Sequence, residues 1–246
     1  MELPDRAGVA SFVAPEGFAA PQTLTLGDDV AHHMKVRRLA NGAPLRLTDG
    51  AGRVATATLV ALARNAATVE VGPVTDVPPP TDVHLLAPIG DRDRMLWLAE
   101  KATELGVTSW RPVLWHRSRS VQPRGEGAGF QAKVRARMLS ALAQSHGAWL
   151  PSVYPDATLD RALAALPAEA NRVTLDGEGE PLTARLAAPP GPIVLALGPE
   201  GGLDAEERAK LAAHGFRAAS LGPTVLRFET AGLAALAITR ALTRPA

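Results

Sequence analysis

The spacing of apolar and polar positions changes near residue 78, where prolines occupy positions 78–80. Before them, short β-rich runs are separated by the turn dipeptides Asn-Gly at 41–42 and Asp-Gly at 49–50. Such turns between short strands are typical of a small β-barrel or sandwich. Consecutive prolines end helix and sheet alike, so we predict a first domain over residues 1–77. Its expected strands are residues 44–48, 54–60 and 67–71, and its expected helix is residues 28–39.

After the prolines, predicted strands alternate with predicted helices. Residues 192–197 contain the continuous apolar run Ile-Val-Leu, which is typical of a strand buried on both faces. Residues 92–105 and 228–242 have the apolar spacing of helices. This alternation predicts an α/β domain over residues 78–246, with a mostly parallel sheet flanked by helices. The other expected strands are residues 83–88, 107–114, 172–175 and 216–221, and the other expected helices are residues 131–145, 182–187 and 204–213.

The composition excludes several classes of protein. Of the 246 residues, 46% are apolar and none is cysteine. The chain can therefore build a core, but it can form neither a disulfide nor a thiolate metal site. There is no signal-peptide pattern, and no apolar run approaches the roughly 20 residues of a membrane span. We therefore expect a soluble, cytoplasmic protein.

The net charge is only +1, but basic residues gather in two places. Residues 111–137 hold seven Arg or Lys against one acid, Glu126. Both clusters can contact phosphates, although charge alone favours ordinary solvated surfaces. The second cluster consists of His32, His33, Lys35, Arg37 and Arg38.

Two glycine-bearing loops, each after a predicted strand, are the strongest candidates for a ligand site. The first reads Leu-Gly-Pro-Glu-Gly-Gly at 197–202; the second begins with Leu-Gly at 221–222 and continues into Leu-Arg-Phe-Glu-Thr-Ala at 226–231. Open α/β sheets bind ligands at the carboxyl ends of strands, and glycine lets backbone approach a ligand closely. Neither loop matches the dinucleotide or P-loop pattern. A single such loop is usually only a tight turn, but two so close in sequence favour a site.

These motifs resemble the C-terminal signature of the RsmE family, which are small-subunit ribosomal RNA uridine-N3 methyltransferases of the SPOUT superfamily. Lys-Ala-Thr-Glu-Leu-Gly-Val at 101–107 and Arg-Ser at 117–118 are also similar to that family. In the first domain, residues 32–38 and the Asp-Gly pair at 49–50 resemble its PUA-like RNA-binding domain. The resemblance covers most of the chain. It is weakest at residues 125–166, and His116 stands where the family often has an acid.

The resemblance implies an S-adenosylmethionine-dependent enzyme whose C-terminal domain is a trefoil knot, a rare exception to the rule that chains are unknotted. It also implies a homodimer that acts on 16S ribosomal RNA, in an assembled or partly assembled small subunit. Backbone groups and leucines would hold the methyl donor, since leucines can sandwich the flat adenine. Carried over by position, the cofactor-binding residues are Leu175, Leu197, Gly198, Pro199, Glu200, Gly201, Gly202, Leu221, Gly222 and Leu226.

The expected reaction points to the candidate catalytic residues. Uridine N3 attacks the methylsulfonium only after losing its proton, so the enzyme must align the two groups and stabilise the developing anion. A cation near the uracil oxygens would do so, and we expect Arg227 and then Arg117 in this role. Glu229 could accept the proton or orient an arginine. Structural roles remain open as well, because Glu229 could cap the last helix and Arg227 could simply pair with Glu200 or Glu229.

For RNA binding, we expect phosphate contacts from the first domain and from the arginines after residue 116. Uridine within ribosomal structure would have to leave its stack to reach the methyl donor. Three of the four tryptophans, at 110, 115 and 149, could stack on RNA bases or pack in a core. The expected RNA-binding residues are His33, Lys35, Arg37, Arg38 and Arg119.

The acids Asp176, Glu178 and Glu180 are arranged like a metal cluster at first sight. They lie in a glycine-rich turn without further acids nearby, which favours a solvated loop, so we predict no metal. Two other functions remain open. A knotted methyltransferase could act on transfer RNA or another base, and a module of this fold could bind RNA without catalysis. The intact motifs at 197–202 and 226–231 argue against the second.

Overall fold

The computed structural model describes residues 9–118, 125–186 and 191–243. Contacts along the chain divide it into two units. Unit 1 comprises Met1–Pro79 with Leu139–Leu150, and unit 2 comprises Pro80–Met138 with Pro151–Ala246. Among the described residues, no helix combines the length and the hydropathy that a bilayer crossing requires.

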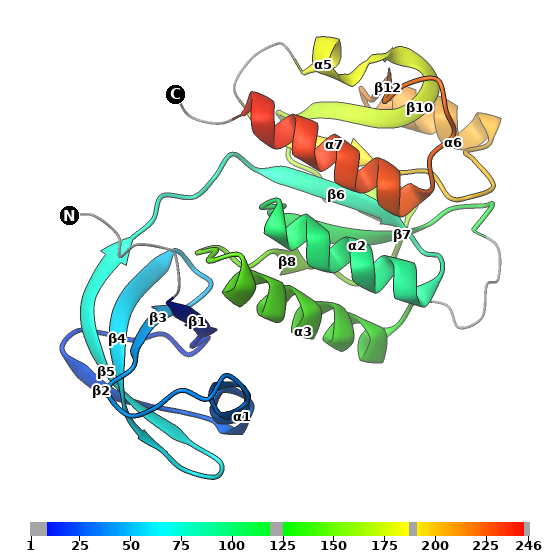
Figure 1. The fold of residues 1–246 in the computed structure, drawn as a ribbon. Helices are drawn as coiled ribbons and strands as arrows, with labels where there is room; N and C mark the ends of the chain where they lie inside the picture. Colours follow the sequence, from blue (N-terminus) through cyan, green and yellow to red (C-terminus); the bar gives the residue numbers. More distant parts are fainter. Residues whose placement is uncertain (1–8, 119–124, 187–190, 244–246) are drawn as a thin grey trace. The chain divides into compact units, whose positions relative to one another are not determined.

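Unit 1 is built on a five-stranded sheet with the order β1-β3-β4-β5-β2. Strand β1 pairs with β3 in parallel, and the other neighbours are antiparallel. Its core holds fully buried aliphatic side chains from β3 and β4, among them Leu45 and Leu59, and Met34 of the helix. The elements of unit 1 are β1 (Ala10–Val13), β2 (Gln22–Leu26), α1 (Asp28–Val36), β3 (Pro44–Thr48), β4 (Arg53–Leu62) and β5 (Ala67–Asp76) (Figure 1).

Three strands and the helix of unit 1 were predicted, and β1 and β2 were not. Strand β3 has the predicted bounds, whereas β4 and β5 are longer than expected. The helix ends at Val36 rather than at residue 39, because Arg38 adopts a φ of 54°. A left-handed residue stops a helix. Its turn is closed by the Leu39 N–H, which donates to Met34 O at 3.0 Å.

The segment Leu139–Leu150 packs within unit 1 although it is remote from it in sequence. Trp149 forms an isolated antiparallel bridge with Ala51, and its indole N–H donates to Val77 O at 3.1 Å. A Cβ on Gly52 would collide with the Trp149 ring, and Gly52 has a φ of +99°. Trp149 is therefore a packing residue of this unit, as the core reading of the sequence expected.

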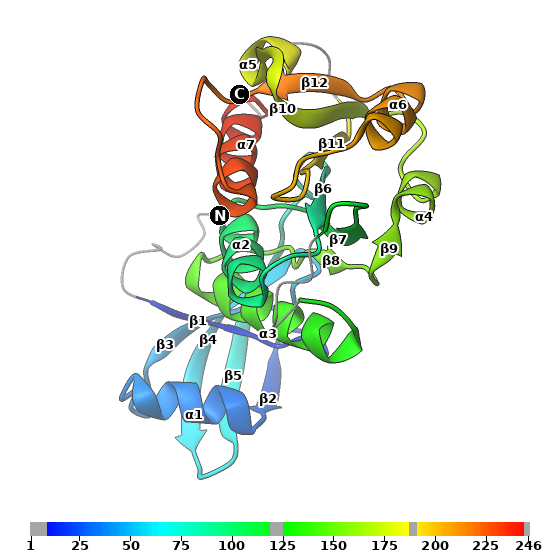
Figure 2. The same cartoon turned by 90° about the vertical axis from the view of Figure 1, so that its right-hand side faces the viewer.

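Unit 2 contains a seven-stranded parallel sheet with the order β12-β10-β11-β6-β7-β8, and β9 also pairs with β7. Figure 2 shows α2 and α7 on one face of this sheet and α4 and α6 on the other. The elements are β6 (Val83–Pro88), α2 (Arg92–Glu104), β7 (Ser109–Leu114), α3 (Ala128–Gln144), β8 (Ser152–Val153), β9 (Ala157–Thr158), α4 (Leu159–Ala164), β10 (Asn171–Pro181), α5 (Leu182–Arg185), β11 (Ile193–Ala196), α6 (Ala205–Ala213), β12 (Arg217–Ser220) and α7 (Phe228–Leu242). Helix α3 belongs to this unit as far as Met138, and its end belongs to unit 1.

The predicted parallel sheet flanked by helices is confirmed. Strands β8 and β9 and helix α4 were not predicted, and they are short. The order of the strands determines where a site can form. Strand β11 lies between β6 and β10, and β10 lies between β11 and β12. Because these strands are parallel, the loops that leave β10, β11 and β12 emerge side by side at one edge. The trefoil knot stays a prediction.

Candidate functional site

The carboxyl ends of β10, β11 and β12 surround a cavity of about 610 Å³. The cavity is lined by all of the predicted cofactor residues except Gly201, and also by Arg227 and Phe228. Sites for small molecules have volumes of about 300–1,000 Å³ and are mostly apolar with a few polar groups. The two glycine-bearing loops of the sequence therefore come together around one space of the size of a ligand site.

The first loop, residues 197–203, is tightly folded. The Leu197 N–H donates to Leu86 O at 3.0 Å, which extends the ladder from β11 to β6. The Gly202 N–H donates to Pro199 O at 2.8 Å and closes a turn in which Gly202 adopts a φ of +70°. A side chain is strained at such a φ, so the turn requires glycine at this position.

Gly201 lies against Arg117. A Cβ at Gly201 would stand 3.0 Å from Arg117 Cβ and 3.2 Å from its carbonyl oxygen. The Arg117 Nη1 donates to Gly201 O at 3.3 Å. The structure thus brings the predicted catalytic residue Arg117 against the first loop. Gly201 is not among the residues that line the cavity, and its contact with the cofactor stays a prediction.

The second loop, residues 221–227, is far more exposed. Gly222 adopts a φ of +135°, and its N–H donates to Ser220 Oγ at 3.1 Å. Val225 is fully exposed, at 102%, and Leu226 is also exposed. The loop ends where the buried Phe228 begins α7. Its apolar side chains therefore project from the rim of the cavity.

A charged pair that the sequence reading had dismissed also lines the cavity. Asp176 forms an ion pair with Arg208 of α6, and both residues line the space. Strand β10 continues to Pro181 and has an irregular register against β12 between Leu175 and Glu180. This irregularity carries Asp176 to the cavity. The reading of Asp176 as part of a solvated loop is therefore wrong.

Three ion pairs link the predicted catalytic residues at the mouth of the cavity. Arg227 Nη1 lies 3.5 Å from Glu200 Oε1. Arg94 Nη1 of α2 lies 3.0 Å from the same oxygen and 3.6 Å from Glu229 Oε1. Glu229 is only 13% exposed in its side chain, and its Oε2 is buried without a hydrogen-bond partner among the described residues. Two arginines thus pair with two glutamates here, and Arg117 lies against Gly201 of the first loop.

Arg94 was missed by the sequence analysis. Its position was recoverable in part: it lies in the first turn of the helix that follows β6, and β6 is the neighbour of β11. The Asp91 side chain caps this helix by accepting from the Arg94 N–H at 3.0 Å. Nothing in the local pattern, however, shows that its guanidinium reaches Glu200, which is 106 residues away.

The predicted RNA-binding residues His33, Lys35, Arg37 and Arg38 all lie in unit 1, on α1 and the turn after it, and all are exposed. Lys35 Nζ donates to Arg64 O at 2.7 Å. Arg119 lies outside the described residues. The side chains of Trp110 and Trp115 are at most 2% exposed. Of the two roles that the sequence left open for them, stacking on RNA bases is therefore wrong and packing in a core is right.

Comparison with known proteins shows which family this chain is similar to. The family model of an RNA methyltransferase domain matches residues 77–240, and the family model of an RNA methyltransferase PUA domain matches residues 26–72. Ribosomal RNA small subunit methyltransferase E of Mycobacterium bovis is 33% identical over 98% of this chain and 89% of the relative. The Synechocystis protein of the same name is 30% identical over 94% of this chain and 76% of the relative.

Solved structures agree with these relatives. A ribosomal RNA small subunit methyltransferase E from Neisseria gonorrhoeae, solved bound to S-adenosyl methionine, has a TM-score of 0.87 and 32% identity. The match covers 95% of this chain and 98% of that one. A putative methyltransferase from Legionella pneumophila, in complex with the same cofactor, has a TM-score of 0.85 and 26% identity over 95% and 97% of the two chains. This chain therefore belongs to the ribosomal RNA small subunit methyltransferase E family of RNA methyltransferases.

Proposed function

We propose that this protein transfers a methyl group from S-adenosylmethionine to N3 of a uridine in 16S ribosomal RNA. The observation that carries the proposal is the cavity at the carboxyl ends of β10, β11 and β12, in a chain of this family. We also propose that residues 78–246 form a trefoil knot. Strand β11 lies between β6 and β10 although it follows both in sequence.

The residues around the cavity fit the cofactor. Leucines at 175, 197, 221 and 226 provide apolar walls for adenine, and the glycines of the two loops leave backbone groups accessible beside it. Asp176, held by Arg208, offers a carboxylate to the polar part of the molecule. When bound, S-adenosylmethionine supplies an electrophilic methyl group on a sulfonium.

The charged residues at the mouth of the cavity fit the other half of the reaction. A uracil that loses its N3 proton spreads negative charge over its two carbonyl oxygens, and fixed cations stabilise that charge. Arg227 is the first candidate because it lines the cavity and is well exposed. Arg117 is the second. Arg94 holds Glu229 through Oε1. The Oε2 of Glu229, which has no hydrogen-bond partner in the described part of the chain, is the proposed acceptor of the proton.

RNA binding is assigned to both parts of the chain. Residues 1–77 are proposed as the RNA-binding domain, with His33, Lys35, Arg37 and Arg38 on phosphates. In unit 2, Arg92, Lys133 and Arg137 line a groove between α2 and α3, and Asp93 is the one acid among its lining residues. The density of positive charge in this groove suits a phosphate backbone.

A homodimer is part of the proposal, and so is action on an assembled or partly assembled small subunit in the cytoplasm. Exposed apolar residues support the dimer. Val225 and Leu226 project from the second loop, and Trp97 on α2 is 43% exposed. Large exposed apolar groups often mark protein interfaces. A second copy of the chain would cover them and complete the site.

The test is methylation of RNA by the purified protein. Small subunits and naked 16S ribosomal RNA, both from cells that lack the modification, are incubated with the cofactor and analysed by mass spectrometry. We expect one N3-methyluridine in the 16S RNA with wild-type protein and a strong reduction with Glu229→Gln. Methylation of transfer RNA or of another base would support a different target. Cofactor binding without any methylated RNA would support a non-catalytic module.

A further inference from the structure

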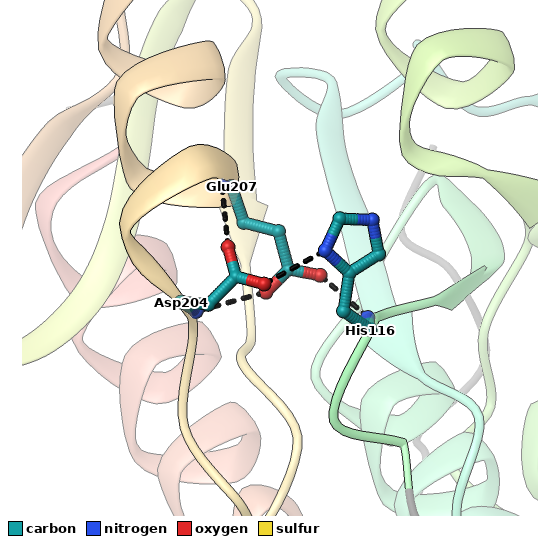
Figure 3. A group of neighbouring side chains, drawn as sticks. All are labelled: His116, Asp204 and Glu207. Atoms are coloured by element: carbon teal, nitrogen blue, oxygen red, sulfur yellow. Dashed lines mark hydrogen bonds and ion pairs between the residues drawn. The ribbon is translucent and has the colours of Figure 1, made fainter.

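Three side chains meet between the turn that follows β7 and the start of α6: His116, Asp204 and Glu207 (Figure 3). His116 Nδ1 lies 2.7 Å from Asp204 Oδ2, and the His116 N–H donates to Glu207 Oε1 at 2.6 Å. Asp204 and Glu207 also form a capping box, in which each side chain accepts from the backbone N–H of the other, at 2.8 Å and 3.0 Å. The start of α6 is thus bonded to the turn at residue 116.

This set has the composition of a metal site, since one ligand atom from each residue lies within 4.8 Å of the others. The hydrogen bonds argue for a different role. Each of the four carboxylate oxygens already faces an N–H group or the His116 ring, and Glu207 is only 2% exposed. A cation would have to displace these bonds. The three residues are therefore better described as a clasp that joins two segments.

The two segments that the clasp joins both border the candidate site. His116 directly precedes Arg117, and Asp204 follows the first loop, residues 197–203. The turn around His116 is closed because the Ser118 N–H donates to Trp115 O at 3.0 Å and the Trp115 N–H donates to Ser118 Oγ at 3.2 Å. Arg117 is in turn held against Gly201. The clasp thus closes a ring that contains Arg117 and the first loop.

We propose that His116, Asp204 and Glu207 are positioning residues, which fix Arg117 against the first loop so that cofactor affinity and turnover depend on the charge of His116. The proposal rests on the proposed function, since it takes the first loop as part of the cofactor site.

The charges around His116 give the expected dependence on pH. The hydrogen bond that the His116 ring donates to Asp204 raises the pKa of His116 above its ordinary value of 6.5, and Glu207 and Glu206 act in the same direction. The pKa of Asp204 is lowered, first by the Glu207 N–H and then by His116. The charged groups of α6, α4 and the turn that face or neighbour the ring are Asp204, Glu206, Glu207, Lys210, Asp160 and Arg117.

The directions of these two pKa shifts determine how the strength of the clasp changes with pH. A histidine whose pKa is raised in the folded protein stabilises the fold fully below its unfolded pKa, and the contribution is lost as pH rises through the folded pKa. The clasp is therefore strongest when Asp204 and His116 are both charged. It weakens as pH rises through the raised pKa of His116, above 6.5.

The experiment measures S-adenosylmethionine affinity by calorimetry, and turnover, from pH 6 to pH 9. Relative to His116→Asn, we expect both in the wild type to fall by about two- to fivefold across the titration of His116, the size typical of an exposed ion pair. His116→Asn keeps a hydrogen-bond donor where Nδ1 stood but does not titrate. The change of affinity and turnover with pH that His116 contributes should therefore be missing in this variant. His116→Ala should bind S-adenosylmethionine at every pH with the lower affinity that the wild type shows at high pH. The ligand's own titration is the same for all variants and cancels.

A matched control lies on the same helix. His214 ends α6, and its Nδ1 lies 2.9 Å from Lys210 O. His214→Asn makes the same chemical change at the other end of α6, away from the first loop, and should keep the wild-type pH dependence.

Three results would overturn the clasp. If the wild type binds the cofactor with a pH dependence equal to that of His116→Asn, His116 does not control the site, and the proposed function is untouched. If Zn²⁺ alone binds the wild type saturably and this binding is lost in His116→Ala, the cluster is a metal site. If the wild type binds no cofactor at all, the proposed function fails together with the clasp.

Discussion

The two loops that line the cavity carry similar glycine motifs but are held very differently. The first loop is fixed from several sides: Gly201 packs on Arg117, Glu200 pairs with Arg94, and the buried Leu203 packs in the core of unit 2. The second loop, residues 221–227, is exposed along most of its length. One half of the site is therefore pre-organised, which lowers the entropy cost of binding. The other half has fewer contacts with the rest of unit 2 and is open to solvent.

The largest effect should follow from disturbing the fixed loop. Gly201→Val places a branched side chain 3.0 Å from Arg117 Cβ and 3.2 Å from the Arg117 carbonyl oxygen, and the backbone oxygen cannot yield easily. Overpacking of this kind costs about 1–3 kcal/mol, so calorimetry should show cofactor affinity reduced by about 10- to 100-fold. Gly129→Val is the control, since a Cβ there meets nothing within 4 Å. Equal affinities for the two variants would mean that Arg117 does not hold the loop.

The next effect concerns the charged residue at the end of the exposed loop. Arg227→Ala removes a cation from the mouth of the cavity, and hydrogen bonds to charged groups are worth about 1.5–3 kcal/mol. Turnover should fall by about 10- to 100-fold while cofactor affinity changes little. Arg217→Ala, which removes an exposed arginine of β12 outside the cavity, is the control. Equal losses in turnover and cofactor affinity would assign Arg227 to binding instead.

A smaller effect is expected at the pair between Asp176 and Arg208. Asp176→Asn keeps the shape of the side chain but removes the charge that faces the cavity, and should weaken cofactor binding by about three- to tenfold. Arg208→Gln leaves Asp176 in place and should have the weaker effect if Asp176 itself contacts the ligand. If Arg208→Gln were the more damaging variant, the pair would act by holding α6 rather than by binding.

The smallest effect on the cofactor should come from Val225→Ser at the tip of the exposed loop. The side chain is fully exposed, so cofactor affinity should be unchanged within about twofold. If a second copy buries Val225, the loss of apolar burial is worth about 1 kcal/mol for each of the two copies, and sedimentation should show the dimer dissociating at about 30-fold higher concentration. An unchanged dimer would exclude Val225 from the interface.

The sequence predicted best those elements in which a strong apolar pattern ends at a clear stop signal. Strands β3 and β6 and helix α7 have the predicted bounds, because each combines a strong pattern with a clear stop. The end of α1 was placed too late, since the left-handed conformation of Arg38 has no glycine to mark it. Strands of two residues, such as β8 and β9, are too short to show a period.

The candidate site was predicted from motifs and completed only by the fold. The glycine loops were recognisable because their residue types are unusual and adjacent. Arg94 and the pair between Asp176 and Arg208 were not, because their contacts join segments that are remote in sequence. The clasp had no sequence signal either. His116 and Asp204 are 88 residues apart and meet only because α6 and the turn after β7 pack together.

Hydrogen–deuterium exchange of the full chain, with and without S-adenosylmethionine, tests most directly whether the two loops form one cofactor site. Protection is predicted in residues 175–179, 197–203 and 221–227, with the larger gain in the second loop, which is exposed when free. The turn between β4 and β5 should show no change. Protection confined to other segments, or no gain in either loop at saturating cofactor, would contradict the assignment.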